Sequence, residues 1–230
     1  MIDIDIKPWE RIDSHDEKHK IIQYTRGFLY GTDAVLLSKF AKIKNKDRVL
    51  DLCSGSGIIP VLFAINTECK NITGLEYFSN LTDMASRTVK LNGFEERVSF
   101  ITADLKDIKK HVSSESFDVV TVNPPYKNDG SGIQNENEFK KIARHEILCT
   151  LDDCVKSAAF ALKYGGKLYM VHRADRLADV IYAFKSNKIE PKTLTLVMPK
   201  PNASPKLLLI EGKKGGGSEL KLTPPLILGE

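Results

Sequence analysis

The segment VLDLCSGSGI, residues 49–58, decides the fold of this chain. A short apolar run leads directly into a Gly-x-Gly turn, and a segment of helical length follows. Glycines in such a turn let the backbone approach a ligand where a side chain would block it. The segment therefore predicts a β-strand, a ligand-binding turn and an α-helix in immediate succession.

The turn departs from a dinucleotide-binding fingerprint at two positions. Pro60 occupies the place of the third glycine, and Asp51 stands at the end of the strand, where it would repel a pyrophosphate. A carboxylate at that point suits a ligand with a cationic ammonium or sulfonium group. The pattern thus favours a cationic cofactor over a dinucleotide.

Apolar runs of strand length alternate with helical segments on both sides of this turn. The predicted strands of the first part are 48–52, 71–76, 98–103, 117–122 and 167–171, and the predicted helices are 58–65, 79–92 and 151–162. Two further extended runs, 193–198 and 206–210, are joined by PKPNASP, which predicts an antiparallel hairpin. We expect an α/β fold of Rossmann-like type, with a doubly wound, mostly parallel sheet of seven strands and a terminal antiparallel hairpin.

Composition places limits on the class of protein. The 230 residues are 42% hydrophobic, which is enough for a single compact domain. No stretch reaches the roughly 18 apolar residues of a membrane span, and charges replace the apolar region of a signal peptide, so we expect a cytoplasmic protein. The net charge of +4 is too small to make the whole surface a nucleic-acid binder.

The four cysteines do not have the spacing of a metal site. They are Cys53, Cys69, Cys149 and Cys154, and they form neither a CxxC pair nor a His/Cys grouping. We therefore expect free thiols and no metal.

Acidic residues end the next two predicted strands as well. Glu76 ends the second strand, where it is placed to accept the two hydroxyls of a ribose. Asp104 follows the third strand, where it can accept a hydrogen bond from an adenine amino group while Leu105 packs against the ring. Each acid alone also fits a helix N-cap. Three acids at the ends of three successive strands indicate a cofactor site.

The fourth predicted strand runs into the tetrapeptide Asn123-Pro124-Pro125-Tyr126. Its prolines hold the backbone extended, so the Asn123 amide oxygen and the Pro124 carbonyl can accept both hydrogens of an NH2 group. Such hydrogen bonds localise the nitrogen lone pair and aim it at a sulfonium methyl group without a strong general base. Tyr126 can stack on a flipped base. We interpret these four residues as catalytic; a simple strand-ending turn is the alternative.

Together, DLCSGSG, the acids at Glu76 and Asp104, and NPPY resemble the amino-methyltransferase branch of the class I methyltransferases. The stretches RGFLYGTDAVLL at 26–37, LLLIEGKKGG at 207–216 and PPL at 224–226 are similar to the bacterial tRNA(valine) adenine-N6 methyltransferases. The resemblance implies that the chain uses S-adenosyl-L-methionine, releases S-adenosyl-L-homocysteine, and methylates N6 of the adenine next to the anticodon.

The resemblance also implies that residues 1–46 cover the cofactor and substrate site and that residues 47–230 form the catalytic domain. The residues that we expect to bind the cofactor are Tyr30, Gly31, Thr32, Asp51, Cys53, Gly55, Gly57, Glu76, Tyr77, Asp104, Leu105 and Asn123. We expect an RNA partner, no membrane and a monomer. The polar stretch 127–146 is either a substrate lid or a disordered loop.

Two alternatives stay open. A protein glutamine N5-methyltransferase acting on a release factor would present an amide NH2 to the same Asn123 and Pro124 acceptors, but such enzymes usually carry a helical substrate domain first, and only about 45 residues precede the first strand here. A non-catalytic protein that binds cofactor and RNA is the other alternative. It would have no chemical reason to keep the NPPY tetrapeptide.

Overall fold

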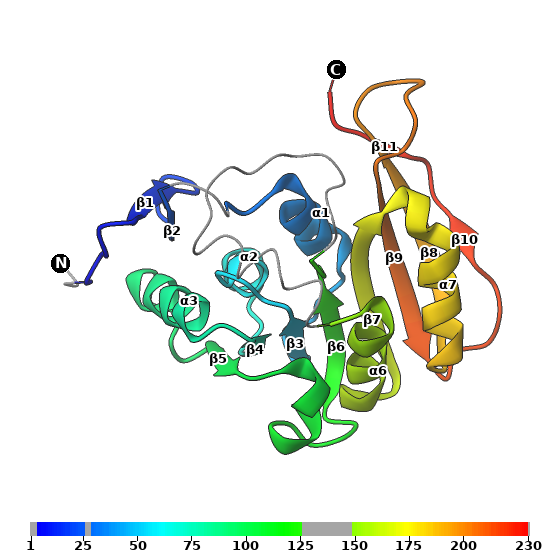
Figure 1. Ribbon diagram of the computed structural model, residues 1–230, viewed down its shortest axis with the longest axis horizontal. Helices are drawn as coiled ribbons and strands as arrows, with labels where there is room; N and C mark the ends of the chain where they lie inside the picture. The colour runs from blue at the N-terminus through cyan, green and yellow to red at the C-terminus, as the bar shows by residue number, and fades with distance from the viewer. Residues whose placement is uncertain (1–3, 26–28, 126–148, 230) are drawn as a thin grey trace.

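A computed structural model describes residues 4–25, 29–125 and 149–229 of the chain. A mostly parallel β-sheet lies between two layers of helices, as Figure 1 shows. The expected α/β doubly wound architecture is confirmed.

Seven long strands form the body of the sheet, in the order β8-β9-β7-β6-β3-β4-β5. Their bounds are β3 Arg48–Leu52, β4 Asn71–Glu76, β5 Val98–Thr102, β6 Phe117–Val122, β7 Leu162–Arg173, β8 Ile189–Met198 and β9 Leu207–Lys214. Strands β3 to β7 run parallel to one another, whereas β9 is antiparallel to both β7 and β8. The chain order reverses at β3, which is where an open α/β sheet binds its ligands.

Two features of the sheet differ from the sequence prediction. The two-residue strands β10, Lys221–Leu222, and β11, Leu226–Ile227, pair with β8 and extend the sheet. Strand β7 begins at Leu162, five residues earlier than expected. Elements so short, or interrupted by glycines such as Gly165 and Gly166, carry no clear alternation of polar and apolar residues.

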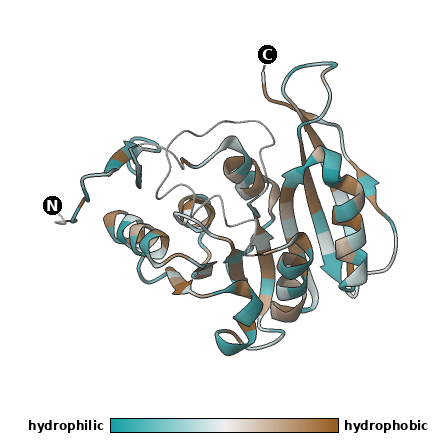
Figure 2. Ribbon diagram, viewed as in Figure 1, coloured by the Kyte–Doolittle hydropathy of each residue, from teal (hydrophilic) through white to brown (hydrophobic). Residues whose placement is uncertain are grey.

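The helices cover the two faces of the sheet. On one face lie α1 Thr32–Phe40, α2 Ile58–Asn66 and α3 Ser79–Leu91; on the other lie α6 Leu151–Ala161, α7 Leu177–Ser186 and the 3-10 helix η1 Leu105–Lys110, with the short η2 Ala174–Arg176 preceding α7. The central strands are mostly brown in Figure 2 because both of their faces are buried. Burial of this apolar surface is the main force that holds the layers together.

An N-terminal hairpin stands apart from the main sheet. Strands β1, Glu10–Ser14, and β2, Lys20–Tyr24, pair only with each other and pack against α3. Ile22 and Tyr24 of β2 join Leu81 and Met84 of α3 in a small apolar cluster. None of the helices in the described residues is long and apolar enough to cross a membrane.

Candidate functional site

The carboxyl ends of the parallel strands meet at one edge of the sheet and border a shallow, open cleft. The residues that line the cleft are Cys53, Leu75, Glu76, Tyr77, Ala103, Asp104, Leu105 and Cys149. Five of these were expected from the sequence to bind a cofactor. Leu75, Ala103 and Cys149 were not. Buried apolar residues next to a strand end have no distinctive pattern, and the spacing of Cys149 gives no signal of a site.

The glycine turn between β3 and α2 is tightly packed. Gly57 adopts φ +78°, and a Cβ there would lie 2.6 Å from Phe100 Cζ and 2.7 Å from Ala85 Cβ. A larger residue would therefore push α2 away from α3 and β5. The Gly55 N–H donates to Glu76 Oε2 at 2.9 Å, which ties the turn to the end of β4.

Asp51 is completely buried at the end of β3. Its Oδ1 accepts a hydrogen bond of 2.6 Å from Thr121 Oγ1 on the neighbouring strand β6, while its Oδ2 has no partner among the described residues. Burial raises the pKa of Asp51 to about 7, and hydrogen bonding with Thr121 and Ser54 offsets only part of this effect. A cation brought to this carboxylate would supply the missing partner.

Glu76 is buried at the end of β4 and organises the two loops that border the cleft. Besides the bond from Gly55, its Oε1 accepts the Phe78 N–H at 3.1 Å. Each carboxylate oxygen has a second lone pair, so Glu76 can still accept the hydroxyls of a ribose. Its backbone bonds fix the orientation in which it would do so.

Asp104 combines the two roles that the sequence left open. It is the N-cap of η1, where its Oδ1 accepts the Lys106 N–H at 2.9 Å. It also lines the cleft, together with Leu105 directly after it. A capping role thus does not remove Asp104 from the candidate site.

Asn123, Pro124 and Pro125 follow the end of β6, the strand next to β3. Val122 is in register with Leu52, so Asn123 follows β6 at the level where Cys53 follows β3. Asn123 is half-buried and Pro124 is buried. Tyr126 and the stretch 127–146 lie outside the described residues.

Tyr30, Gly31 and Thr32 lie before and at the start of α1, and none of them lines the cleft described above. The Tyr30 N–H donates to Gln23 Oε1 at 3.2 Å, and Gln23 Nε2 in turn donates to Asp13 Oδ2 at 2.5 Å. Tyr30 is thereby linked to the N-terminal hairpin. Gln23 was not singled out in the sequence.

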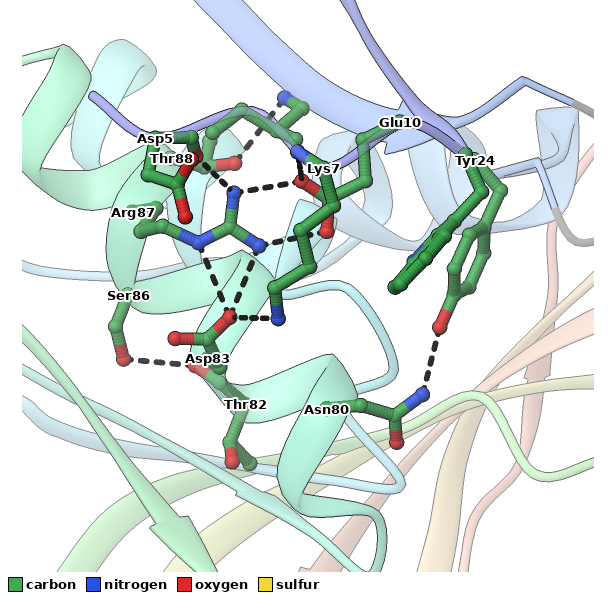
Figure 3. Close-up of polar contacts among 12 residues, drawn as sticks. Asp5, Lys7, Glu10, Tyr24, Asn80, Thr82, Asp83, Ser86, Arg87 and Thr88 are labelled. Carbon is green, nitrogen blue, oxygen red and sulfur yellow. Dashed lines mark hydrogen bonds and ion pairs between the residues drawn. The ribbon is translucent and has the colours of Figure 1, made fainter.

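An ion-pair network anchors that hairpin to α3, as Figure 3 shows. Arg87 of α3 donates to both carboxylate oxygens of Glu10, at 2.7 and 2.6 Å, and also to Asp83 Oδ2 and the Asp5 carbonyl. Lys7 Nζ reaches the same Asp83 oxygen at 2.8 Å. Because the Glu10 side chain is only 1% exposed, the pair is shielded from solvent.

Three of the four cysteines meet beside the cleft. All four are free thiols, as expected. The Sγ atoms of Cys53, Cys149 and Cys154 lie within 4.8 Å of one another, whereas the fourth cysteine, Cys69, belongs to the apolar core on the other face of the sheet. Hydrogen bonding with Cys149 and burial raise the pKa of both Cys53 and Cys154. Sequence spacing gave no indication of this grouping.

The residues of the cleft, together with Asp51, which is buried two positions before the cleft residue Cys53, suit the groups of S-adenosyl-L-methionine. The unpartnered, buried Asp51 oxygen suits its ammonium group, the anchored Glu76 carboxylate suits its ribose, and Asp104 and Leu105 suit its adenine. These four side chains come from the ends of three adjacent strands.

Comparison with known proteins gives a consistent result. A family model described as the methyltransferase small domain matches residues 26–181. A tRNA1(Val) (adenine(37)-N6)-methyltransferase of Bacteroides thetaiotaomicron is 28% identical over 181 residues, which cover 78% of this chain and 74% of that protein. The protein of the same name from Haemophilus influenzae is 29% identical over 143 residues, covering 61% of this chain and 60% of that protein.

Solved structures share the fold. A predicted O-methyltransferase from Agrobacterium tumefaciens superposes with a TM-score of 0.69 at 22% identity, covering 85% of this chain and 86% of that one. A geranyl diphosphate C-methyltransferase from Streptomyces coelicolor, crystallised with S-adenosyl-L-homocysteine, gives a TM-score of 0.58 at 12% identity, covering 80% and 75%. At these sequence identities, the structural similarity shows a common fold and nothing about function.

Proposed function

The chain belongs to the methyltransferase small domain family, and from that premise we propose that it transfers a methyl group from S-adenosyl-L-methionine to the N6 amino group of an adenine in tRNA. The observation that carries the proposal is the position of Asn123 and Pro124. They follow β6 directly beside the turn after β3, at the edge of the sheet where the cleft lies.

The cofactor supplies an electrophilic methyl group on a sulfonium. The chain holds that cofactor through Asp51, Glu76 and Asp104 and offers two oxygen acceptors, on Asn123 and Pro124, for the hydrogens of the substrate NH2. An exocyclic amine conjugated with a ring is a poor nucleophile, so acceptors that localise its lone pair lower the barrier. The prolines keep these acceptors in place before the substrate arrives.

The substrate class rests on the relatives. The matched proteins from Bacteroides thetaiotaomicron and Haemophilus influenzae carry the name of an enzyme that acts on adenine 37 of one valine tRNA. We assign the same type of substrate to this chain and, with it, work in the cytoplasm. We also propose a monomer in which residues 1–46 complete the site over the catalytic domain 47–230, with Tyr30, Gly31 and Thr32 at the methionine end of the cofactor and Tyr126 against the target base.

The decisive experiment measures transfer of labelled methyl from S-adenosyl-L-methionine to unmodified bulk tRNA and, in parallel, to a release factor protein. N6-methyladenosine in the tRNA, identified by nucleoside mass analysis, would support the proposal. Methylglutamine in the protein would replace it with the glutamine alternative. Cofactor binding without transfer to either substrate would favour a non-catalytic binding protein.

Asn123→Ala separates catalysis from cofactor binding. We expect transfer to fall by about 100-fold or more, because one of the two acceptors for the substrate amine is lost. The dissociation constant of S-adenosyl-L-homocysteine, measured by calorimetry, should change by less than about threefold, since the charged groups of the cofactor are held elsewhere. A parallel loss of cofactor affinity would mean that Asn123 serves the cofactor, the other role expected from the sequence, and would contradict a role confined to the substrate amine.

A further inference from the structure

Three thiols from two separate parts of the chain lie close together beside the cleft. Cys53 follows β3, Cys149 precedes Thr150, the N-cap of α6, and Cys154 lies in the first turn of that helix. Their Sγ atoms all lie within 4.8 Å of one another, and those of Cys149 and Cys154 are 4.0 Å apart. The capping box between Thr150 and Asp153 fixes the start of the helix and thereby the positions of both α6 thiols.

The distance between two of the sulfurs fits a metal ion. A tetrahedral zinc site with Zn–S bonds of about 2.3 Å holds its sulfurs about 3.8 Å apart. The Cys149–Cys154 separation of 4.0 Å is within a few tenths of an ångström of that value.

The backbone of Cys53 gives an independent reason to regard its thiol as functional. Cys53 adopts φ +56°, a left-handed conformation that glycine occupies at lower cost. A residue other than glycine in this conformation is stabilised by its surroundings or has a functional role. Here the side chain adds the third sulfur to the cluster.

The cluster is open on one side. Cys53 and Cys149 line the cleft, whereas Cys154 is buried behind them. Three protein ligands with a fourth position directed to a cleft are typical of zinc sites that exchange a ligand.

We propose that Cys53, Cys149 and Cys154 form a binding site for a thiophilic divalent cation of the zinc class, and that an ion bound there excludes the cofactor from the cleft. The exclusion rests on the proposed function, because it requires that this cleft holds S-adenosyl-L-methionine. The ion site itself does not depend on that function. Thiolates coordinate ions of this class with no change in the oxidation state of the metal or the sulfur.

The test titrates the reduced, metal-free full-length chain with Cd²⁺ and follows the thiolate-to-cadmium charge-transfer absorption. We expect one ion per chain and protection of three thiols from a thiol-specific reagent. Cys53→Gly removes one ligand and at the same time relieves the backbone, so the variant should fold; its Cd²⁺ affinity should fall by about 100-fold or more. Cys154→Ala should show the same loss, whereas Cys69→Ala, which removes the thiol outside the cluster, should bind as the parent does.

Several results would overturn the site. They are the absence of a charge-transfer band, equal Cd²⁺ affinity in Cys53→Gly and the parent, or loss of binding in Cys69→Ala. A disulfide formed in the parent under mild oxidation, seen as a mass loss of two hydrogens, together with no Cd²⁺ band in the reduced protein, would replace the ion site with a redox pair.

Competition is measured by repeating the titration with saturating S-adenosyl-L-homocysteine. We expect the apparent Cd²⁺ affinity to fall in proportion to the concentration of S-adenosyl-L-homocysteine. Unchanged Cd²⁺ affinity in protein shown to bind S-adenosyl-L-homocysteine would disprove exclusion. A protein that binds Cd²⁺ through the three thiols but never binds S-adenosyl-L-homocysteine would count against the proposed function and leave the ion site intact.

Discussion

Two buried carboxylates of this chain, Glu10 and Asp51, show how differently a fold treats a structural acid and a ligand-binding acid. Burial alone would raise the pKa of Glu10, but the hydrogen bonds from Arg87 and Lys7 outweigh it and hold the pKa below its usual value. Asp51 accepts a hydrogen bond from Thr121 and has no cation beside it among the described residues, and burial raises its pKa to about 7 although Thr121 and Ser54 lower it.

The difference indicates what each acid is for. Glu10 receives its counter-charge from within the chain, so its pair with Arg87 stabilises the position of the N-terminal hairpin. Asp51 lacks an internal cation among the described residues, and its Oδ2 has no partner there. A buried, half-satisfied carboxylate destabilises the free protein, and a cationic ligand removes that penalty. Relief of this local instability on binding therefore contributes part of the cofactor affinity.

Asp51→Asn should show the largest effect. Loss of the carboxylate should weaken S-adenosyl-L-homocysteine binding by about 2–5 kcal/mol, or roughly 30-fold to several thousand-fold, because the ammonium loses its counter-charge. The same variant should be more stable than the parent at pH 8 when no ligand is present, by at most about 4 kcal/mol, since no buried carboxylate need ionise. Calorimetric titration and thermal unfolding check the two parts. A variant that is both weaker in binding and less stable would mean that Asp51 is a structural acid like Glu10.

Arg87→Met addresses the other carboxylate. It leaves Glu10 buried without its cation, and we expect a loss of about 3 kcal/mol in the free energy of unfolding, within the range for a broken buried pair. Amide exchange should accelerate first in residues 10–24, because the hairpin contacts the rest of the chain mainly through α3. The double variant Glu10→Gln/Arg87→Met is the control and should recover part of the loss. Equal stability of the single and double variants would show that the pair contributes little.

These two sites also differ in how far the sequence could predict them. The sequence could predict the acids of the site, Asp51, Glu76 and Asp104, because each stands at the end of a strand. The carboxyl ends of neighbouring parallel strands lie at the same edge of a sheet. The partners of the buried groups could not be predicted, because Thr121 lies 70 residues from Asp51, Arg87 lies 77 from Glu10, and Cys149 lies 96 from Cys53 in the chain. Local patterns contain no information on such pairings.

The N-terminal hairpin was missed for a related reason. In β1 the buried residue is the acid Glu10, while the apolar Ile12 is 42% exposed. This inverts the alternation by which a half-buried strand is recognised. The ion pair with Arg87, rather than apolar burial, decides which side of β1 faces the protein, and no single segment shows that.

Stability and cofactor affinity should depend on pH differently for the two carboxylates, and this effect should be smaller than that of the substitutions above. Asp51 has a folded pKa of about 7, above its ordinary value of 3.8, so the stability that its proton provides is present at low pH and is lost as pH rises through this window. Binding of a cationic cofactor should change in the opposite sense and weaken by about tenfold per pH unit below 7. Glu10 has a lowered pKa, so its contribution is present above its ordinary value of 4.5 and is lost only as pH falls below it.

Cofactor titrations between pH 5.5 and 8.5 check this, with Asp51→Asn as the control that should bind weakly with no slope in this range. A parent protein whose cofactor affinity is flat between these values would show that Asp51 is already ionised in the free site. The contrast with Glu10 would then rest on the hydrogen bonds alone.

Cys53→Gly should have the smallest effect on stability, and it tests whether local instability at this site extends beyond Asp51. The left-handed backbone of Cys53 costs about 1–2 kcal/mol, while glycine loses about 0.5–1 kcal/mol more entropy on folding, so the net gain should be about 0.5–1 kcal/mol. In a chain of this size that corresponds to a rise of about 2 °C in Tm. Thermal unfolding of the metal-free protein measures this change in Tm. Cys69→Ala is the control. It removes a thiol that is buried at ordinary backbone angles, so it should lower the Tm instead. If Cys53→Gly lowers the Tm as much as Cys69→Ala does, packing of the Cys53 side chain outweighs its backbone strain. The instability stored at the cofactor end of the sheet would then belong to the buried carboxylate alone.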